Sequence, residues 1–224
     1  DGRAACSRAA ELARQLGDAV LIAEAGLALG AEISPGVVSE TMVNLLEEAL
    51  AGLPREPSAL RARVLARLAG ALQPARDPTV PVQLAREAIA MARALGDPDT
   101  LRVVLYAAGS ALVDYAPPAE RLDVNQETLR LAQLAGERLQ MFRARLRLFV
   151  DHLELGDVFS ADAALAALTE LANELRRPRQ LWYAAMFHAA RAVQSGRFAD
   201  AERWEQRALD VGAHRDDPVL QLSL

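Results

Sequence analysis

The sequence contains no lysine, and all 25 of its basic residues are arginine. A phosphate-binding loop of the Walker A kind requires a lysine, so this chain cannot contain one. Only one cysteine is present, Cys6, which excludes an internal disulfide bond. Because unpaired cysteine is typical of a reducing compartment, we expect a cytoplasmic protein. No apolar run reaches the roughly 18 residues of a membrane-spanning helix.

Aromatic residues are also scarce, at 4% of the chain, whereas alanine and leucine are abundant. Ala, Leu, Arg and Glu lose little side-chain freedom in a helix, and the β-branched residues that favour strands are sparse. Hydrophobic residues make up 52% of the sequence, which is enough to form a packed core. The composition therefore predicts an all-α fold.

The net charge is −5. Proteins that hold nucleic acid by its phosphates carry a stripe of excess positive charge, which this sequence does not have. We therefore expect no direct nucleic-acid partner, and the lack of a long apolar run predicts no membrane partner.

Helix-breaking residues recur about every 40 residues, as in repeat proteins. Glycine just after a helix permits the left-handed conformation that ends it, and proline prevents the helix from continuing. Such signals stand at Leu16-Gly17-Asp18, Leu53-Pro54-Arg55, Leu95-Gly96-Asp97, Ala135-Gly136-Glu137, Arg176-Arg177-Pro178 and Ala213-His214-Arg215. Two helical segments fit between successive signals, so the repeating unit is predicted to be a helix hairpin.

Equivalent positions carry related side chains in the later repeats. In the second helix of each hairpin the equivalent residues are Ala88, Thr128, Leu168 and Ala208. In the first helix they are Ala69, Gly109, Phe149 and Ala189. Small residues at a fixed position let two helices approach closely. This register predicts an α-solenoid, a tetratricopeptide-like superhelix of about six hairpins.

Residues 1–224 show no linker, so we expect one continuous domain. The predicted helices are 3–16, 19–33, 38–52, 57–73, 80–95, 99–114, 119–135, 138–155, 159–176, 179–195, 199–213 and 218–224. Because the sequence begins and ends inside a helical pattern, we expect it to be a fragment of a larger protein.

Residues 196–201, Gly-Arg-Phe-Ala-Asp-Ala, resemble the tetratricopeptide repeat. In that pattern, glycine and an aromatic residue mark the turn into the second helix, and alanines follow three and ten residues after the aromatic one. Ala201 and Ala208 stand at those distances from Phe198. Most other repeats lack the glycine–aromatic pair and exceed the family's usual period of about 34 residues.

The array also resembles the superhelical regions of MalT-like and LuxR-type transcription regulators and of related STAND ATPases. The amino-acid sequences of the segments 45–50 and 84–97 are similar to those of such regions. The resemblance implies a non-catalytic protein–protein interaction scaffold in a larger bacterial signalling or transcriptional regulator. Its partner would be a protein, a peptide or another domain of the parent chain. The alternative is a sensor domain that binds a small-molecule inducer.

Residues that carry chemistry do not gather in the sequence. The three histidines, His152, His188 and His214, fall in different repeats and predict hydrogen-bonded or solvated side chains, not a metal site. Adjacent carboxylates such as Glu47-Glu48 point about 100° apart on a helix, which suits a solvated face better than an acid–base pair. We expect no catalytic residue, metal or cofactor. An enzymatic role is the remaining alternative, which a cleft with a strongly perturbed titratable pair would support.

The predicted partner-binding residues lie on the first helices of the hairpins: Arg63, Arg67, Tyr106, Arg143, Arg147, Tyr183, Met186 and Phe187. If these helices line an inner wall, arginines one turn apart would bind a partner carboxylate and the aromatic residues would anchor apolar side chains. The alternative is ordinary packing, with the arginines paired to acidic residues of neighbouring helices and the aromatic residues inside the core.

Overall fold

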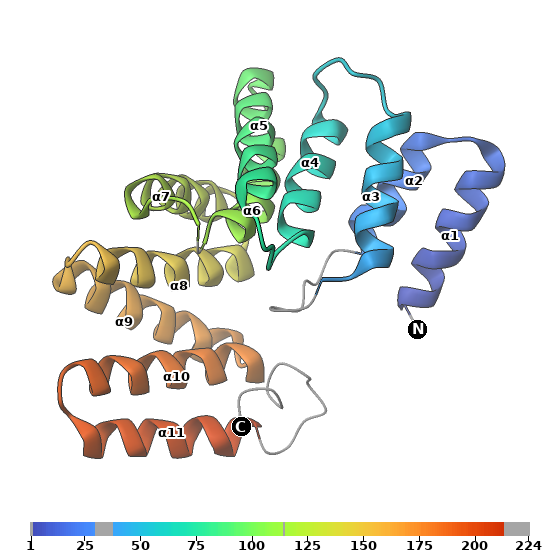
Figure 1. Cartoon of the computed structure of the whole chain (residues 1–224). Coiled ribbons are helices and arrows are strands. Elements are labelled where there is room, and N and C mark those ends of the chain that lie inside the picture. Colours follow the sequence, from blue (N-terminus) through green and yellow to red (C-terminus); the bar gives the residue numbers. More distant parts are fainter. Residues whose placement is uncertain (1, 30–37, 114, 213–224) are drawn as a thin grey trace. The chain divides into compact units, whose positions relative to one another are not determined.

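The computed structural model describes residues 2–29, 38–113 and 115–212, and all regular secondary structure within these ranges is helical (Figure 1). The all-α prediction is confirmed. The described helices are α1 (Gly2–Leu16), α2 (Ala19–Leu29), α3 (Glu40–Gly52), α4 (Ala59–Ala71), α5 (Thr79–Leu95), α6 (Pro98–Leu112), α7 (Pro118–Ala135), α8 (Arg138–Glu154), α9 (Val158–Leu175), α10 (Pro178–Gln194) and α11 (Phe198–Gly212). The predicted helix over 218–224 and the end of the one over 19–33 lie outside the described residues.

The chain divides into two compact units, Asp1–Leu131 and Ala132–Leu224, and the division falls inside α7. Within each unit the helices pack on their neighbours in chain order, from α1 to α6 in the first and from α8 to α11 in the second. This is the packing of an α-solenoid, as the register predicts. A single domain over 1–224 stays a prediction.

The forty-residue spacing reappears in the bounds of the later helices. The helices α6, α8 and α10 begin at Pro98, Arg138 and Pro178, and the helices α7, α9 and α11 begin at Pro118, Val158 and Phe198. Residues that follow α5, α7 and α9 adopt the left-handed conformation, with φ of 70° at Gly96, 71° at Gly136 and 51° at Arg176. The second helix of each of these hairpins thus ends at an equivalent residue in the left-handed conformation.

Side-chain burial follows the same register. The four equivalent residues Ala88, Thr128, Leu168 and Ala208 are 0, 1, 0 and 2% exposed. Thr128 is tolerated in this apolar row because its hydroxyl donates a hydrogen bond to the Val124 carbonyl at 2.7 Å. The corresponding face of each second helix is therefore turned to the core.

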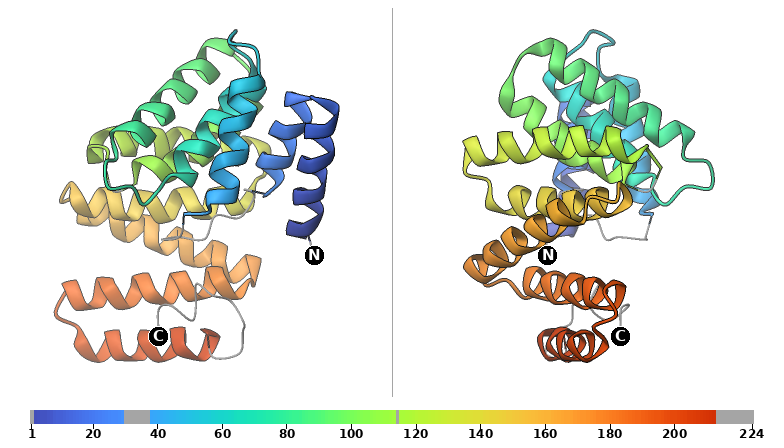
Figure 2. Two further views of the ribbon diagram at one scale, coloured as in Figure 1. Left: turned by 45° about the vertical axis from the view of Figure 1, so that its right-hand side comes forward. Right: turned by 90° about the vertical axis from the view of Figure 1, so that its left-hand side faces the viewer.

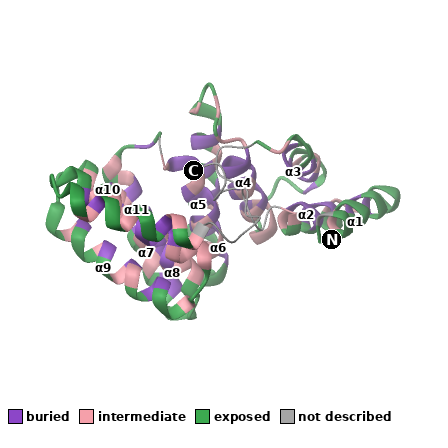
Figure 3. Cartoon of the chain, turned by 90° about the horizontal axis from the view of Figure 1, so that it is seen from below, coloured by how far each residue is buried: buried purple, intermediate pink, exposed green. Residues whose placement is uncertain are grey.

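The first unit has two cores, one among α1 to α4 and one among α4 to α7. Leu46 and Val64 are fully buried in the first of them, and Leu105 and Leu112 in the second. Burial of each such side chain contributes roughly 1.5–3 kcal/mol. The helix α1 is mostly exposed, as the green ribbon in Figure 3 shows.

Two bidentate ion pairs join alternate helices of the first unit. Arg14 of α1 binds Glu48 of α3, with Nη2 and Oε2 2.6 Å apart, and Arg86 of α5 binds Glu120 of α7 at 2.7 Å. Hydrogen bonds from the guanidinium groups lower the pKa of both glutamates. Because all four side chains are substantially exposed, each pair stabilises the fold by only about 0–1 kcal/mol.

The described part of the second unit contains the end of α7 and the antiparallel hairpins α8–α9 and α10–α11 (Figure 2). Its larger core packs Phe142 and Phe149 of α8 against Leu165 and Leu168 of α9. A smaller core, around Trp182, lies between α10 and α11. Among the helices described in either unit, none is long and apolar enough to cross a membrane.

Candidate functional site

The eight predicted partner-binding residues are divided between the two units. Arg63, Arg67 and Tyr106 belong to the first unit, and Arg143, Arg147, Tyr183, Met186 and Phe187 belong to the second.

In the first unit, Arg63 is half-buried and turns towards the start of α6. Its Nη2 donates to the Thr100 hydroxyl at 3.3 Å. Hydrogen bonds from Thr100, and secondarily the Arg63 charge, lower the pKa of Asp97, which caps α6. This arrangement supports the packing interpretation for Arg63. Arg67 and Tyr106 are also half-buried.

In the second unit, the aromatic residues predicted to anchor a partner pack on one another. Tyr183 and Phe187 stack with their ring centroids 6.4 Å apart, and Phe187 meets Phe149 edge-on at 5.3 Å. Met186 packs beside Trp182 in the smaller core. Tyr183, Met186 and Phe187 are half-buried, so they belong largely to the packing of the hairpins.

The two arginines of α8 differ in accessibility. Arg143 is half-buried, whereas Arg147 is only 4% exposed. A partner carboxylate therefore reaches Arg143 more readily than Arg147, although the two lie one turn apart. Partner binding by this set of residues stays a prediction.

Each unit buries polar side chains, most of which are not among the predicted partner-binding residues. The α7 helix buries Arg121, Asn125 and Thr128 in the first unit, and the α8 helix buries Arg147 and Asp151 in the second. Arg121 Nη1 donates to the Val113 carbonyl at 2.6 Å. In the forty-residue register Asp151 stands where Ala71 and Ala111 stand, so this row of the sequence carried the signal.

A polar and aromatic cluster lies within the second unit, between α9, α10 and α11. The His188 ring stacks on Trp204, with centroids 4.2 Å apart and planes 10° from parallel. Its Nε2 lies 2.9 Å from the Thr169 hydroxyl oxygen, and that hydroxyl donates to the Leu165 carbonyl at 2.8 Å. Because the hydroxyl has one hydrogen, Nε2 of His188 must be the donor.

Next to this cluster is a shallow, open hollow of about 260 Å³ lined by Arg203, Trp204 and Arg207 of α11. The guanidinium carbon of Arg207 lies 5.2 Å from the centre of the Trp204 ring, which is the geometry of a cation–π contact. Burial, followed by the charges of Arg207 and Arg197, lowers the pKa of His188. His188 is therefore neutral at pH 7.

The hairpin turns of the second unit expose a group of apolar side chains that we call the turn surface. Both turns, α8–α9 and α10–α11, lie at the same end of the unit (Figures 1 and 2). The turn surface consists of Leu155 (47% exposed), Val158 (45%), Phe159 (87%), Val193 (53%) and Phe198 (64%).

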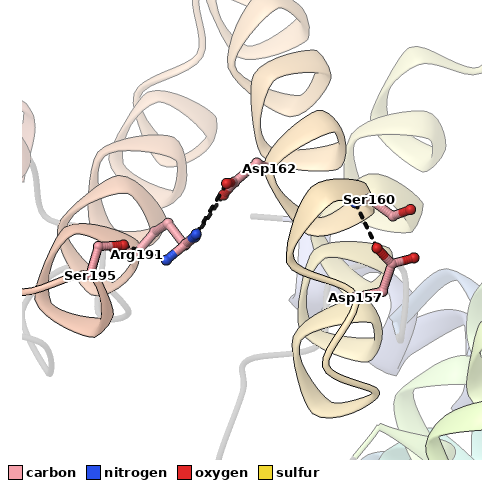
Figure 4. A network of polar contacts seen from close by, with 5 residues as sticks. All are labelled: Asp157, Ser160, Asp162, Arg191 and Ser195. Atoms are coloured by element: carbon pink, nitrogen blue, oxygen red, sulfur yellow. Dashed lines mark hydrogen bonds and ion pairs between the residues drawn. The ribbon is translucent and has the colours of Figure 1, made fainter.

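An ion pair ties the two hairpins together beside the turn surface (Figure 4). Arg191 of α10 binds Asp162 of α9 in a bidentate manner, with its Nε 2.6 Å from Oδ1 and its Nη2 3.1 Å from Oδ2. The same guanidinium contacts the Ser195 hydroxyl, and Asp157 caps α9 by accepting from the Ser160 N–H at 3.0 Å. The pKa of Asp162 is lowered, mainly by the hydrogen bond from Arg191.

No protein-family model matches this chain. No curated protein shows significant similarity to it either. Membership of the tetratricopeptide family, which rests on the repeat motif around Phe198, therefore stays a prediction. The link to MalT-like or LuxR-type regulators, which rests on the segments 45–50 and 84–97, also stays a prediction.

In the part of the chain that the structure describes, no three His, Cys, Asp or Glu side chains are grouped so that they would hold a metal ion. The features that stand out from ordinary helix packing are the turn surface and the hollow on α11. Both belong to the second unit, and both present aromatic side chains on helices that are fixed by packing and hydrogen bonds.

Proposed function

We propose that this chain is a non-catalytic protein–protein interaction scaffold or sensor region of a larger bacterial signalling or transcriptional regulator. Stacked hairpins support the proposal, because a solenoid exposes an extended surface suited to peptides and other domains. The regulatory context comes from the similarity of the repeats to those of MalT-like and LuxR-type regulators.

The observation that carries the proposal is the turn surface. Phe159 is 87% exposed and Phe198 is 64% exposed, although contact of large apolar side chains with water is energetically unfavourable. Burying one of them in an interface contributes roughly 1.5–3 kcal/mol. The ion pair of Arg191 with Asp162 holds the two hairpins in place, so little additional ordering is needed when a partner binds.

The proposal predicts that Phe159→Ser combined with Phe198→Ser weakens partner binding roughly tenfold or more, from the loss of two apolar contacts. The chain should stay folded, because both side chains are exposed. The measurement is affinity capture from an extract of the source organism, comparing the proteins retained by the variant and by the wild type, followed by binding assays with each purified protein.

The matched control is Leu16→Ser combined with Leu134→Ser, which removes two exposed apolar side chains elsewhere, 72% and 75% exposed. A specific partner is retained by the wild type and the control and lost by the turn-surface variant. If all three proteins retain the same partners with the same affinity, the turn surface is not where partners bind.

A second candidate function is binding of a small-molecule inducer. The hollow on α11 favours it, because its volume of about 260 Å³ approaches the lower end of ligand pockets and two arginines line it. An anionic metabolite would then raise the melting temperature of the chain. A thermal-shift screen of carboxylate and phosphate metabolites that produces no shift would count against this candidate.

A further inference from the structure

The hollow on α11 differs in charge from the same face of the earlier second helices. At the position of Arg203 these helices carry Gln83, Asp123 and Ala163. At the position of Arg207 they carry Glu87, Glu127 and Ala167. A face that is acidic in α5 and α7 and neutral in α9 is thus basic in α11. A repeat that reverses the charge of a solvent-facing row presents a surface for a ligand of the opposite charge.

The two arginines of the hollow are accessible to such a ligand. The Arg203 side chain is 76% exposed and pairs with Asp200 on its own helix. Arg207 is exposed, and among the residues that the structure describes its guanidinium contacts the Trp204 ring but no carboxylate.

Trp204 forms a rigid wall of the hollow. One of its faces is stacked against His188, whose Nε2 is fixed by the Thr169 hydroxyl. An immobilised aromatic ring next to an arginine pair loses little conformational entropy when a ligand binds. The lowered pKa of His188, caused by burial and then by the Arg207 and Arg197 charges, agrees with a positive potential at this place.

The spacing of the arginines favours an extended peptide. Residues four apart on a helix have Cβ atoms about 5–6 Å apart. In an extended peptide, residues i and i+2 point to the same side and lie roughly 6.6 Å apart. Two acidic residues at alternate positions would therefore meet Arg203 and Arg207 together.

We propose that the hollow on α11 binds an extended acidic segment of a partner protein, with carboxylates at alternate positions on Arg203 and Arg207. This rests on the proposed scaffold function and names the chemistry of one partner. The guanidinium groups would each donate charge-assisted hydrogen bonds to a carboxylate.

The test is a fluorescence titration of the purified chain with the peptide Ac-Gly-Glu-Leu-Glu-Gly-NH₂. Trp204 is half-buried in the hollow, whereas Trp182 is 6% exposed, so a saturable change reports on Trp204. Arg203→Gln combined with Arg207→Gln should weaken binding by about tenfold or more. The control, Arg8→Gln combined with Arg130→Gln, removes the same charge from exposed positions elsewhere and should bind as the wild type does.

Three results would overturn the proposal: no saturable change with the wild type, equal affinity of the hollow variant, or equal binding of the peptide with Gln in place of Glu. Succinate serves as a further probe, and if it binds as tightly as the peptide the hollow is a small-molecule site. A hollow that fails these tests while the turn-surface variant still loses its partners leaves the proposed function standing. If the hollow passes these tests and the turn-surface variant keeps its partners, the acidic-segment site stands and the turn surface is not where partners bind.

Discussion

His188 occupies a position that is apolar in the other repeats, where Leu68, Ala108 and Leu148 are all buried. A histidine is tolerated there because its ring stacks on Trp204 and its Nε2 donates to Thr169. Burial and two nearby arginines nevertheless make its protonation unfavourable, while Asp162 opposes this effect only in part. One side chain therefore links the packing of three helices to pH.

This linkage predicts a pH-dependent stability. The pKa of His188 in the folded chain lies below its ordinary value of 6.5, so at acidic pH the unfolded chain binds more protons than the folded chain. The contribution to the free energy of unfolding is complete above pH 6.5 and is lost as the pH falls through the folded pKa. His188→Gln keeps a hydrogen-bonding side chain that does not titrate. Its melting temperature should fall less than that of the wild type between pH 7.5 and about 5, and identical pH profiles would contradict the assignment.

At the scale of single elements, the ends of the second helices are set by residues in the left-handed conformation. Gly96 and Gly136 adopt it without a steric penalty, but Arg176 adopts it with φ of 51°. The sequence predicted the end of α9 from Pro178, and the equivalence of Arg176 with the two glycines was visible in the forty-residue register. A non-glycine residue in this conformation costs about 1 kcal/mol.

Replacing Arg176 by glycine should therefore increase the free energy of unfolding by about 0.5–1 kcal/mol. The matched change is Gly136→Ala, which places a side chain in open space at φ 71° and should decrease it by about 1 kcal/mol through backbone strain alone. Urea denaturation of the two variants and the wild type measures both effects. A destabilised Arg176→Gly variant would show that the arginine makes an unrecognised contact.

Helices and their bounds could be predicted because their signals are local. Periodic apolar residues and glycine or proline stops lie within one turn of each end, and the described helices begin and end within two residues of the predicted places, apart from the undescribed end of the segment 19–33. Burial of charge could not be predicted in the same way. Arg143 and Arg147 stand one turn apart on α8, yet Arg143 is half-buried and Arg147 is only 4% exposed.

The candidate sites show the same limit. The predicted aromatic residues Tyr183 and Phe187 were found in contact, but as part of the hairpin packing. Neither the turn surface nor the hollow on α11 was predicted from the sequence, since exposure of Phe159 and stacking of Trp204 depend on how two hairpins meet. The signal for the hollow was nevertheless present as a change of charge between equivalent positions of the repeats.

At the scale of the whole molecule, the fold shows one regularity: equivalent positions of successive repeats face the core. In a repeat protein each hairpin is stabilised by its own packing and by that of its neighbours. The row of Ala88, Thr128, Leu168 and Ala208 includes members of both compact units and is buried throughout. The residues two positions later, Ala90, Arg130, Glu170 and Asp210, are all exposed, because they lie about 200° around the helix.

Cysteine accessibility tests this regularity directly. In a Cys6→Ser background, single cysteines replace each of these eight residues in turn, and the rate of reaction with a thiol reagent is measured under native conditions. We predict that cysteines at 88, 128, 168 and 208 react slowly and those at 90, 130, 170 and 210 react rapidly, with rates differing on the order of a hundredfold. If any position of the first row reacts as fast as the second row while the variant remains folded, the repeats do not share one register and the hairpin array is wrong.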